Sequence, residues 1–93
     1  MTGNGIRDRL SEAALYEQLA EEAAELAAAA SKAARIMRGE NPARCSLLHA
    51  KGKVVSEYSD VVLSAAEANV AASQEQIARK RRRWKDALDA WLG

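Results

Sequence analysis

The chain has 93 residues, 14 basic and 13 acidic side chains, a net charge of +1, no Phe and a single cysteine, Cys45. This length predicts one domain, residues 1–93, and the near-neutral charge favours no class of charged partner. One cysteine excludes an internal disulfide framework and fits a reducing compartment. Residues 1–10 lack the apolar core of a signal peptide, and no stretch of about 18 apolar residues exists. We therefore expect a cytoplasmic protein with no membrane partner.

The large apolar residues are few, because 21 of the 93 residues are Ala. A domain of this size buries only about 60–65% of its unfolded surface, and each Ala contributes little buried area. A stable fold is therefore expected to need a second copy of the chain, which predicts a homo-oligomer.

The first predicted helix covers residues 6–38, a segment rich in Ala, Leu, Glu and Lys, which are strong helix formers. Its apolar residues recur every three or four positions and define one buried stripe. The members of this stripe are Leu15, Leu19, Ala23, Leu26, Ala30 and Ala33. Gly39, Asn41 and Pro42 are expected to end the helix.

A second helix is predicted over residues 46–72, with Gly52 weakening its start and residues 52–55 as a candidate break. A third is predicted over residues 73–92, with Ser73 as its N-cap and Gln76 three residues later. Strand patterns are nearly absent. The fold class is therefore all-α, an antiparallel bundle of three helices, or of four if the first bends or the second divides at Gly52.

Two pairs of acids occur at helical spacing, Glu22 with Glu25 and Glu57 with Asp60. Residues three apart on a helix point the same way. The Glu22–Glu25 pair lies about 15 residues, or roughly 22 Å of helix, from the turn between the helices. The Glu57–Asp60 pair lies about 12 residues, or roughly 18 Å, from the same turn. An αα-hairpin would place both pairs at the same height, so four carboxylates can meet.

Four converging carboxylates repel one another unless a cation neutralises them, and Mg²⁺ or Mn²⁺ prefers oxygen ligands. Both pairs border apolar positions, where an unpaired acid costs desolvation energy. Acid pairs on helices are nevertheless commonly solvated. The residues alone therefore leave two interpretations, a divalent-cation site and two solvated helix faces.

The chain resembles the MazG-like nucleotide pyrophosphohydrolases of the all-α NTP-pyrophosphatase superfamily, whose motifs are EExxE, then ExxD, then a later helix with a basic residue. The matching segments are Glu21-Glu22-Ala23-Ala24-Glu25, Glu57-Tyr58-Ser59-Asp60 and the basic segment from Lys80 to Arg83 with Trp84. Arg38-Gly39-Glu40-Asn41-Pro42 is similar to the loop after the first helix in small members. The spacer between the acidic motifs is longer than usual in the family.

The resemblance implies hydrolysis of a nucleoside triphosphate to the monophosphate and pyrophosphate by a dimer or tetramer. Four acids would hold Mg²⁺, or Mn²⁺ in its place: Glu22, Glu25, Glu57 and Asp60. Glu21 would be an auxiliary acid that holds a second metal or orients water. Lys80 and Arg83, with Trp84 beside them, would bind the substrate, and the cationic groups would stabilise charge on the leaving pyrophosphate.

Other interpretations compete with this one. A non-enzymatic helical oligomerisation or adaptor module would leave the acids solvated and use the basic run 79–83 as an interaction surface. That run could also bind nucleic acid, although the acidic first helix would repel a phosphate backbone. Cys45 and His49 lack a third catalytic partner, and one histidine is too few for a di-iron bundle.

Overall fold

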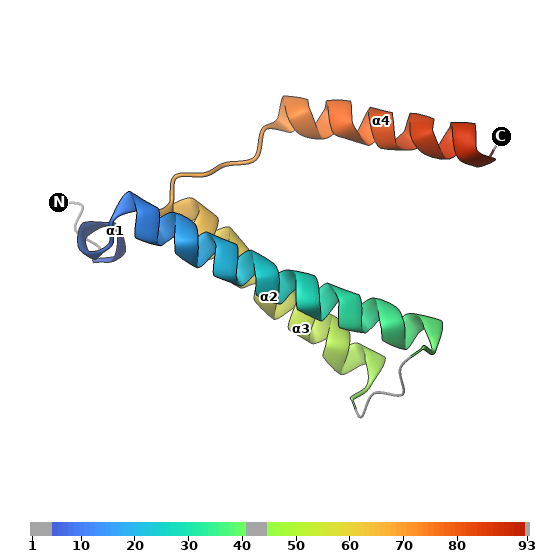
Figure 1. The fold of residues 1–93 in the computed structure, drawn as a ribbon, viewed down its shortest axis with the longest axis horizontal. Coiled ribbons are helices and arrows are strands. Elements are labelled where there is room, and N and C mark those ends of the chain that lie inside the picture. The colour runs from blue at the N-terminus through green and yellow to red at the C-terminus, as the bar shows by residue number, and fades with distance from the viewer. Residues whose placement is uncertain (1–4, 41–44, 93) are drawn as a thin grey trace.

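The computed structural model describes residues 5–40 and 45–92, which form four helices and no strand (Figure 1). The helices are α1 (Ile6–Arg9), α2 (Glu12–Arg38), α3 (Leu47–Glu67) and α4 (Gln74–Leu92). The prediction of an all-α chain is therefore confirmed for the described residues. None of their helices is both long enough and apolar enough to span a lipid bilayer.

The structure divides the segment predicted as one helix, residues 6–38, into α1 and α2, which corresponds to the alternative of four helices with a bend in the first. Leu10 is extended, with φ −117° and ψ 141°, and Ser11 is the N-cap of α2. The Ser11 hydroxyl accepts a hydrogen bond of 3.1 Å from the Ala14 N–H. A Ser side chain that satisfies such a free N–H stabilises a helix start, and here it outweighs the helix propensity of the flanking residues.

The short helix α1 is attached to the C-terminal end of α3 through one arginine. The Arg7 guanidinium donates a hydrogen bond of 2.8 Å to the Ala66 carbonyl oxygen and lies 3.5 Å from the Glu67 carboxylate. A guanidinium can contact a carbonyl and a carboxylate together because its donors form a planar fork. These contacts hold α1 across the open end of the α2–α3 pair.

Helix α2 ends at Gly39, as predicted. Gly39 adopts the left-handed conformation with φ 71°. The Gly39 and Glu40 N–H groups donate to the carbonyls of Ile36 and Arg35, which completes a Schellman motif. The other predicted stop residues, Asn41 and Pro42, lie outside the described residues.

Helix α3 continues through Gly52, so the candidate break at residues 52–55 does not occur. The helix ends at Glu67 rather than at residue 72, because Asn69 takes a positive φ of 63°. Asn tolerates this conformation better than most residues. The Val70 N–H then donates to the Ala65 carbonyl over 2.8 Å in a second Schellman motif.

The predicted N-cap of the last helix is confirmed, since the Ser73 hydroxyl accepts a 3.1 Å hydrogen bond from the Gln76 N–H. Helix α4 is joined to α3 by an extended segment and lies apart from the α2–α3 pair (Figure 1). All of its residues are exposed. The predicted bundle is therefore restricted, within the described chain, to the antiparallel hairpin of α2 and α3.

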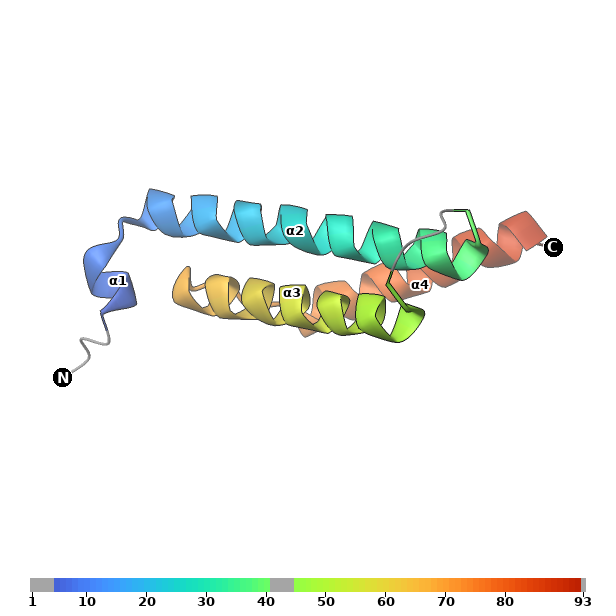
Figure 2. The ribbon, with the colours of Figure 1, turned by 90° about the horizontal axis from the view of Figure 1, so that it is seen from below.

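Helices α2 and α3 run side by side in the hairpin (Figure 2). They pack mainly through small side chains. The buried apolar residues are Leu15, Ala29, Ala33, Ala50 and Ala68. Of the predicted stripe on α2, Leu15 and Ala33 are buried and Leu19 and Leu26 are half-buried, whereas Ala23 and Ala30 are exposed. A core built mainly from Ala brings the two backbones close together but buries little area.

Replacing Ser46 by Ala is expected to destabilise the fold by about 1 kcal/mol, because the Ser46 hydroxyl caps α3. It accepts a 3.0 Å hydrogen bond from the His49 N–H. Denaturant unfolding followed by circular dichroism measures the change. Ser56→Ala, on the exposed surface of the same helix, is the matched control. Equal stability of the two variants would contradict the capping role.

Candidate metal centre

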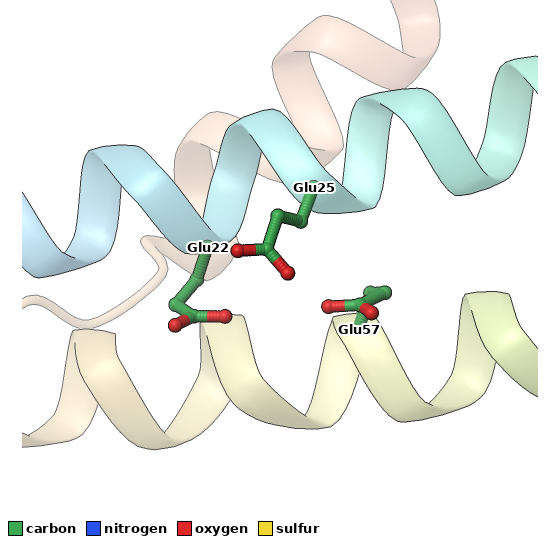
Figure 3. A group of neighbouring side chains, drawn as sticks. All are labelled: Glu22, Glu25 and Glu57. Carbon is green, nitrogen blue, oxygen red and sulfur yellow. The ribbon is translucent and has the colours of Figure 1, made fainter.

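Three carboxylates from the two arms of the hairpin converge at its middle (Figure 3). Glu22 and Glu25 project from α2 and Glu57 projects from α3, and one oxygen from each lies within 4.8 Å of the others. The 3.6-residue period of α2 places its two acids on the same side, and the antiparallel packing puts Glu57 opposite them. The predicted convergence therefore occurs for three of the four acids.

The three acids differ in burial, and Glu57 is the unusual one. Only 4% of Glu57 is exposed, whereas Glu22 is half-buried and Glu25 is exposed. Lys53 pairs with Glu57 Oε2 over 2.8 Å, but Glu57 Oε1 has no hydrogen-bond partner. A buried carboxylate oxygen without a partner is costly, so this atom is suited to contact a cation or a proton donor.

Electrostatic repulsion within the cluster perturbs Glu25. The negative charge of Glu22, followed by that of Glu57, raises the pKa of Glu25 above its ordinary value of 4.5. The hydrogen bond from Lys53 to Glu57 raises the pKa of Lys53. Lys53 is thus the positive charge that the chain itself provides, and it engages one oxygen of the cluster.

The raised pKa of Glu25 predicts a pH dependence of stability without divalent cations. The folded state holds the Glu25 proton more tightly than the unfolded state, so ionised Glu25 opposes folding at neutral pH. Glu25→Gln should therefore melt higher than wild type at pH 7. The difference should shrink as the pH falls through the raised pKa and vanish below 4.5, the ordinary value.

Thermal melts of both proteins across this pH range, in the presence of a chelator, measure the difference. Glu17→Gln, which changes an exposed acid of α2 outside the cluster, is the control. A gap between wild type and Glu25→Gln that stays constant from pH 7 to pH 4 would show that Glu25 is not repelled by its neighbours.

Asp60, the fourth predicted ligand, does not join the three-carboxylate cluster. It is exposed and lies with Glu22 at the edge of a largely apolar cavity of about 180 Å³. The cavity is lined by residues of α2 and α3 and by Ile6 and Leu10, which α1 and its C-terminal end contribute. Asp60 therefore lines the same cavity as Glu22, which belongs to the cluster, but is not itself a member of the cluster.

The remaining predicted site residues lie elsewhere. Glu21 is exposed on α2 and is not a member of the cluster. Lys80, Arg83 and Trp84 are exposed on α4, and 71% of Trp84 is accessible. Within one described chain these residues are not brought together with the three carboxylates (Figure 1).

Sequence reasoning missed the basic residues that adjoin the acids. Lys53 precedes Glu57 by four residues, a spacing at which helical side chains meet, so the ion pair could have been predicted. Lys32 and His49 line a neighbouring cavity with Lys53. Their proximity depends on the register between α2 and α3, which neither helix specifies by itself.

No known protein family, curated protein sequence or solved structure matches this chain. The kind of ion that the cluster can bind therefore follows from its donor atoms alone. They are all carboxylate oxygens, one of them buried without a partner, and this set fits a hard divalent cation such as Mg²⁺ or Mn²⁺.

Proposed function

We propose that this protein is a Mg²⁺-dependent nucleoside triphosphate pyrophosphohydrolase that works as a homo-oligomer. The observation that supports it most is the convergence of Glu22, Glu25 and Glu57 around a buried, unpartnered carboxylate oxygen. The order of the acidic motifs and the later basic helix, which resembles MazG-like enzymes, supplies the reaction class.

In this proposal Glu22, Glu25 and Glu57 hold Mg²⁺, or Mn²⁺ in its place, and Asp60 contributes from the adjacent turn of α3. A cation held by these acids would supply neutralisation of the phosphate charge and a lower pKa for a water molecule. Glu21, exposed beside Glu22, orients the attacking water as an auxiliary acid. The oxygen of that water would bond to the α-phosphorus as the bond to the leaving pyrophosphate breaks, and its proton would pass to a carboxylate outside the three-carboxylate cluster.

The apolar cavity beside Glu22 and Asp60 suits the nucleoside part of the substrate. Its lining includes Ile6, Leu10, Leu15 and Leu63, and it opens next to the carboxylates. Apolar walls with polar groups at one edge are typical of small-molecule sites. With the nucleoside part of a triphosphate bound in this cavity, its phosphates would extend toward the three carboxylates.

The proposed role of Lys80, Arg83 and Trp84 in substrate binding requires assembly. These side chains are exposed on α4, away from the carboxylates of the same chain. A second copy whose α4 lies across the hairpin would bring cationic groups to the phosphates. It would also cover exposed apolar residues of α4, including Trp84 and Trp91.

The experiment is a measurement of pyrophosphate release from a panel of nucleoside and deoxynucleoside triphosphates, with Mg²⁺ or Mn²⁺. Release of the monophosphate and pyrophosphate, lost on chelation, is expected. If every triphosphate persists with both metals, the proposal is overturned.

The exposed α4 also favours a second candidate, a helical adaptor module. Its basic run 79–83 and its two tryptophans are free to contact a protein or a nucleic acid. This candidate predicts no change in melting temperature with Mg²⁺ or Mn²⁺. If it acts through nucleic acid, binding to duplex or single strands should weaken steeply between two salt concentrations.

A further inference from the structure

A cavity rich in basic residues lies beside the carboxylate cluster. It has a volume of about 180 Å³ and is lined by Ala29, Lys32, Cys45, His49, Ala50 and Lys53. No acid lines it. The volume is well above the roughly 10–15 Å³ that one water molecule requires, so a group of several atoms can enter.

This basic cavity continues into the acidic cluster along one groove between α2 and α3. A second cavity, of about 290 Å³, is bordered by Glu25 and Glu57 as well as by Lys32 and Lys53. Lys32 follows Glu25 by seven residues, or two turns of α2, and therefore lies on the same side of that helix. The groove thus changes from negative to positive within about two helical turns.

Such a groove is complementary to a divalent cation bound to a polyphosphate. The carboxylates attract the cation, and the two ammonium groups and the imidazole attract the phosphate oxygens that extend beyond it. The start of α3, capped by Ser46, adds the partial positive charge of a helix N-terminus at the same end.

Lys53 belongs to both parts of the groove. Its ammonium pairs with Glu57 Oε2 over 2.8 Å, yet 61% of its side chain is exposed, so its long stem is free to turn. A divalent cation at the cluster would repel this ammonium. The adjoining cavity, which Lys53 already lines, is where the displaced ammonium would go.

We propose that the cavity lined by Lys32, Lys53 and His49 is a phosphate subsite, and that Lys53 exchanges Glu57 for a phosphate oxygen when a divalent cation occupies the cluster. The inference rests on the proposed cation site and adds a substrate contact made by the hairpin itself. The ligand chemistry is a cation-bound phosphate, whether from a nucleotide or from an inorganic polyphosphate.

Two titrations on the full chain test this inference. Mn²⁺ binding without phosphate is followed by calorimetry, and pyrophosphate binding is then measured at saturating Mn²⁺. In Lys53→Gln, Mn²⁺ should bind several-fold more tightly, because the competing ammonium is gone. The affinity for pyrophosphate should fall by about tenfold or more, as expected for loss of a charge-assisted hydrogen bond.

Lys32→Gln separates the two effects, because Lys32 lines the subsite but forms no ion pair with the cluster acids among the residues that the structure describes. It should weaken pyrophosphate binding and leave the Mn²⁺ affinity near that of wild type. Lys51 is exposed on α3, the helix of Lys53, and lines neither of these two cavities. Lys51→Gln is therefore the matched control and should change neither the Mn²⁺ affinity nor the pyrophosphate affinity. Circular dichroism checks that all three variants fold.

The outcomes distinguish this inference from the proposed function. If Mn²⁺ does not bind wild type, the cation site itself is overturned. If Mn²⁺ binds but Lys53→Gln and Lys51→Gln behave alike in both titrations, only the phosphate subsite is overturned. A non-hydrolysable nucleoside triphosphate that binds more tightly than inorganic triphosphate identifies a nucleotide as the phosphate source, and equal binding identifies an inorganic polyphosphate.

Discussion

Replacing Glu57 by Gln should abolish the stabilisation of this protein by Mg²⁺ or Mn²⁺. A cation present at 100 times its dissociation constant stabilises the fold it binds by about 2.7 kcal/mol. Glu57 supplies the only buried carboxylate of the three in the cluster, and its Oε1 atom has no hydrogen-bond partner among the described residues. An amide at this position carries no charge and presents an N–H₂ group toward the cation, so binding should be lost.

Thermal melts of wild type and Glu57→Gln, with and without millimolar Mn²⁺, measure this effect. Pyrophosphate release should fall at least ~100-fold, since changes even to groups that only support metal ligands cost about 10–100-fold. Glu17→Gln should respond to the metal as wild type does. A full metal-dependent rise in the melting temperature of Glu57→Gln would exclude the cluster as the cation site.

Ala50→Leu should have the largest effect on the fold. Ala50 is 3% exposed and lies where α3 packs against α2, so a larger side chain must either push the two helices apart or enter the cavity that Ala50 lines. Overpacking of this kind costs about 1–3 kcal/mol. In a hairpin whose core consists mostly of Ala, that loss is a large part of the total stability.

Urea unfolding at a fixed protein concentration measures the loss. Ala27→Leu, which adds the same side chain to an exposed position of α2, is the control and should be near neutral. Equal stability of the two variants would mean that the Leu side chain enters the adjoining cavity without separating α2 from α3, and the expected overpacking would be contradicted.

The helical periods were sufficient to predict where most helical segments lie, because apolar spacing and strong helix formers act locally. A bend in the first helix was one of the alternatives, but its place at Leu10 and Ser11 was not predicted, since it depends on one hydroxyl that competes with good helix formers on both sides. Helix α4 was predicted as a helix, but its position was not. Its apolar residues have no obligatory partner within the chain, so periodicity does not determine where it packs.

The candidate site was predictable to the extent that it depends on spacing. Glu22, Glu25 and Glu57 meet because the nearly equal arms of the hairpin bring them to about the same height. Asp60 lies outside the cluster because the rotation of α3 about its own axis decides which acid faces α2. That rotation is set by close packing of residues such as Ala50 and Ala33, which a pattern of apolar positions does not resolve.

The short segment between α3 and α4 limits how copies of this chain can be arranged. Its six residues, from Ala68 to Ser73, span at most about 20 Å when extended. Helix α4 can therefore pack on a neighbouring hairpin only if its binding position there starts within this distance of the Asn69 turn. In an assembly in which copies exchange their α4 helices, the C-terminus of each α3 must therefore lie close to the hairpin that receives the exchanged helix.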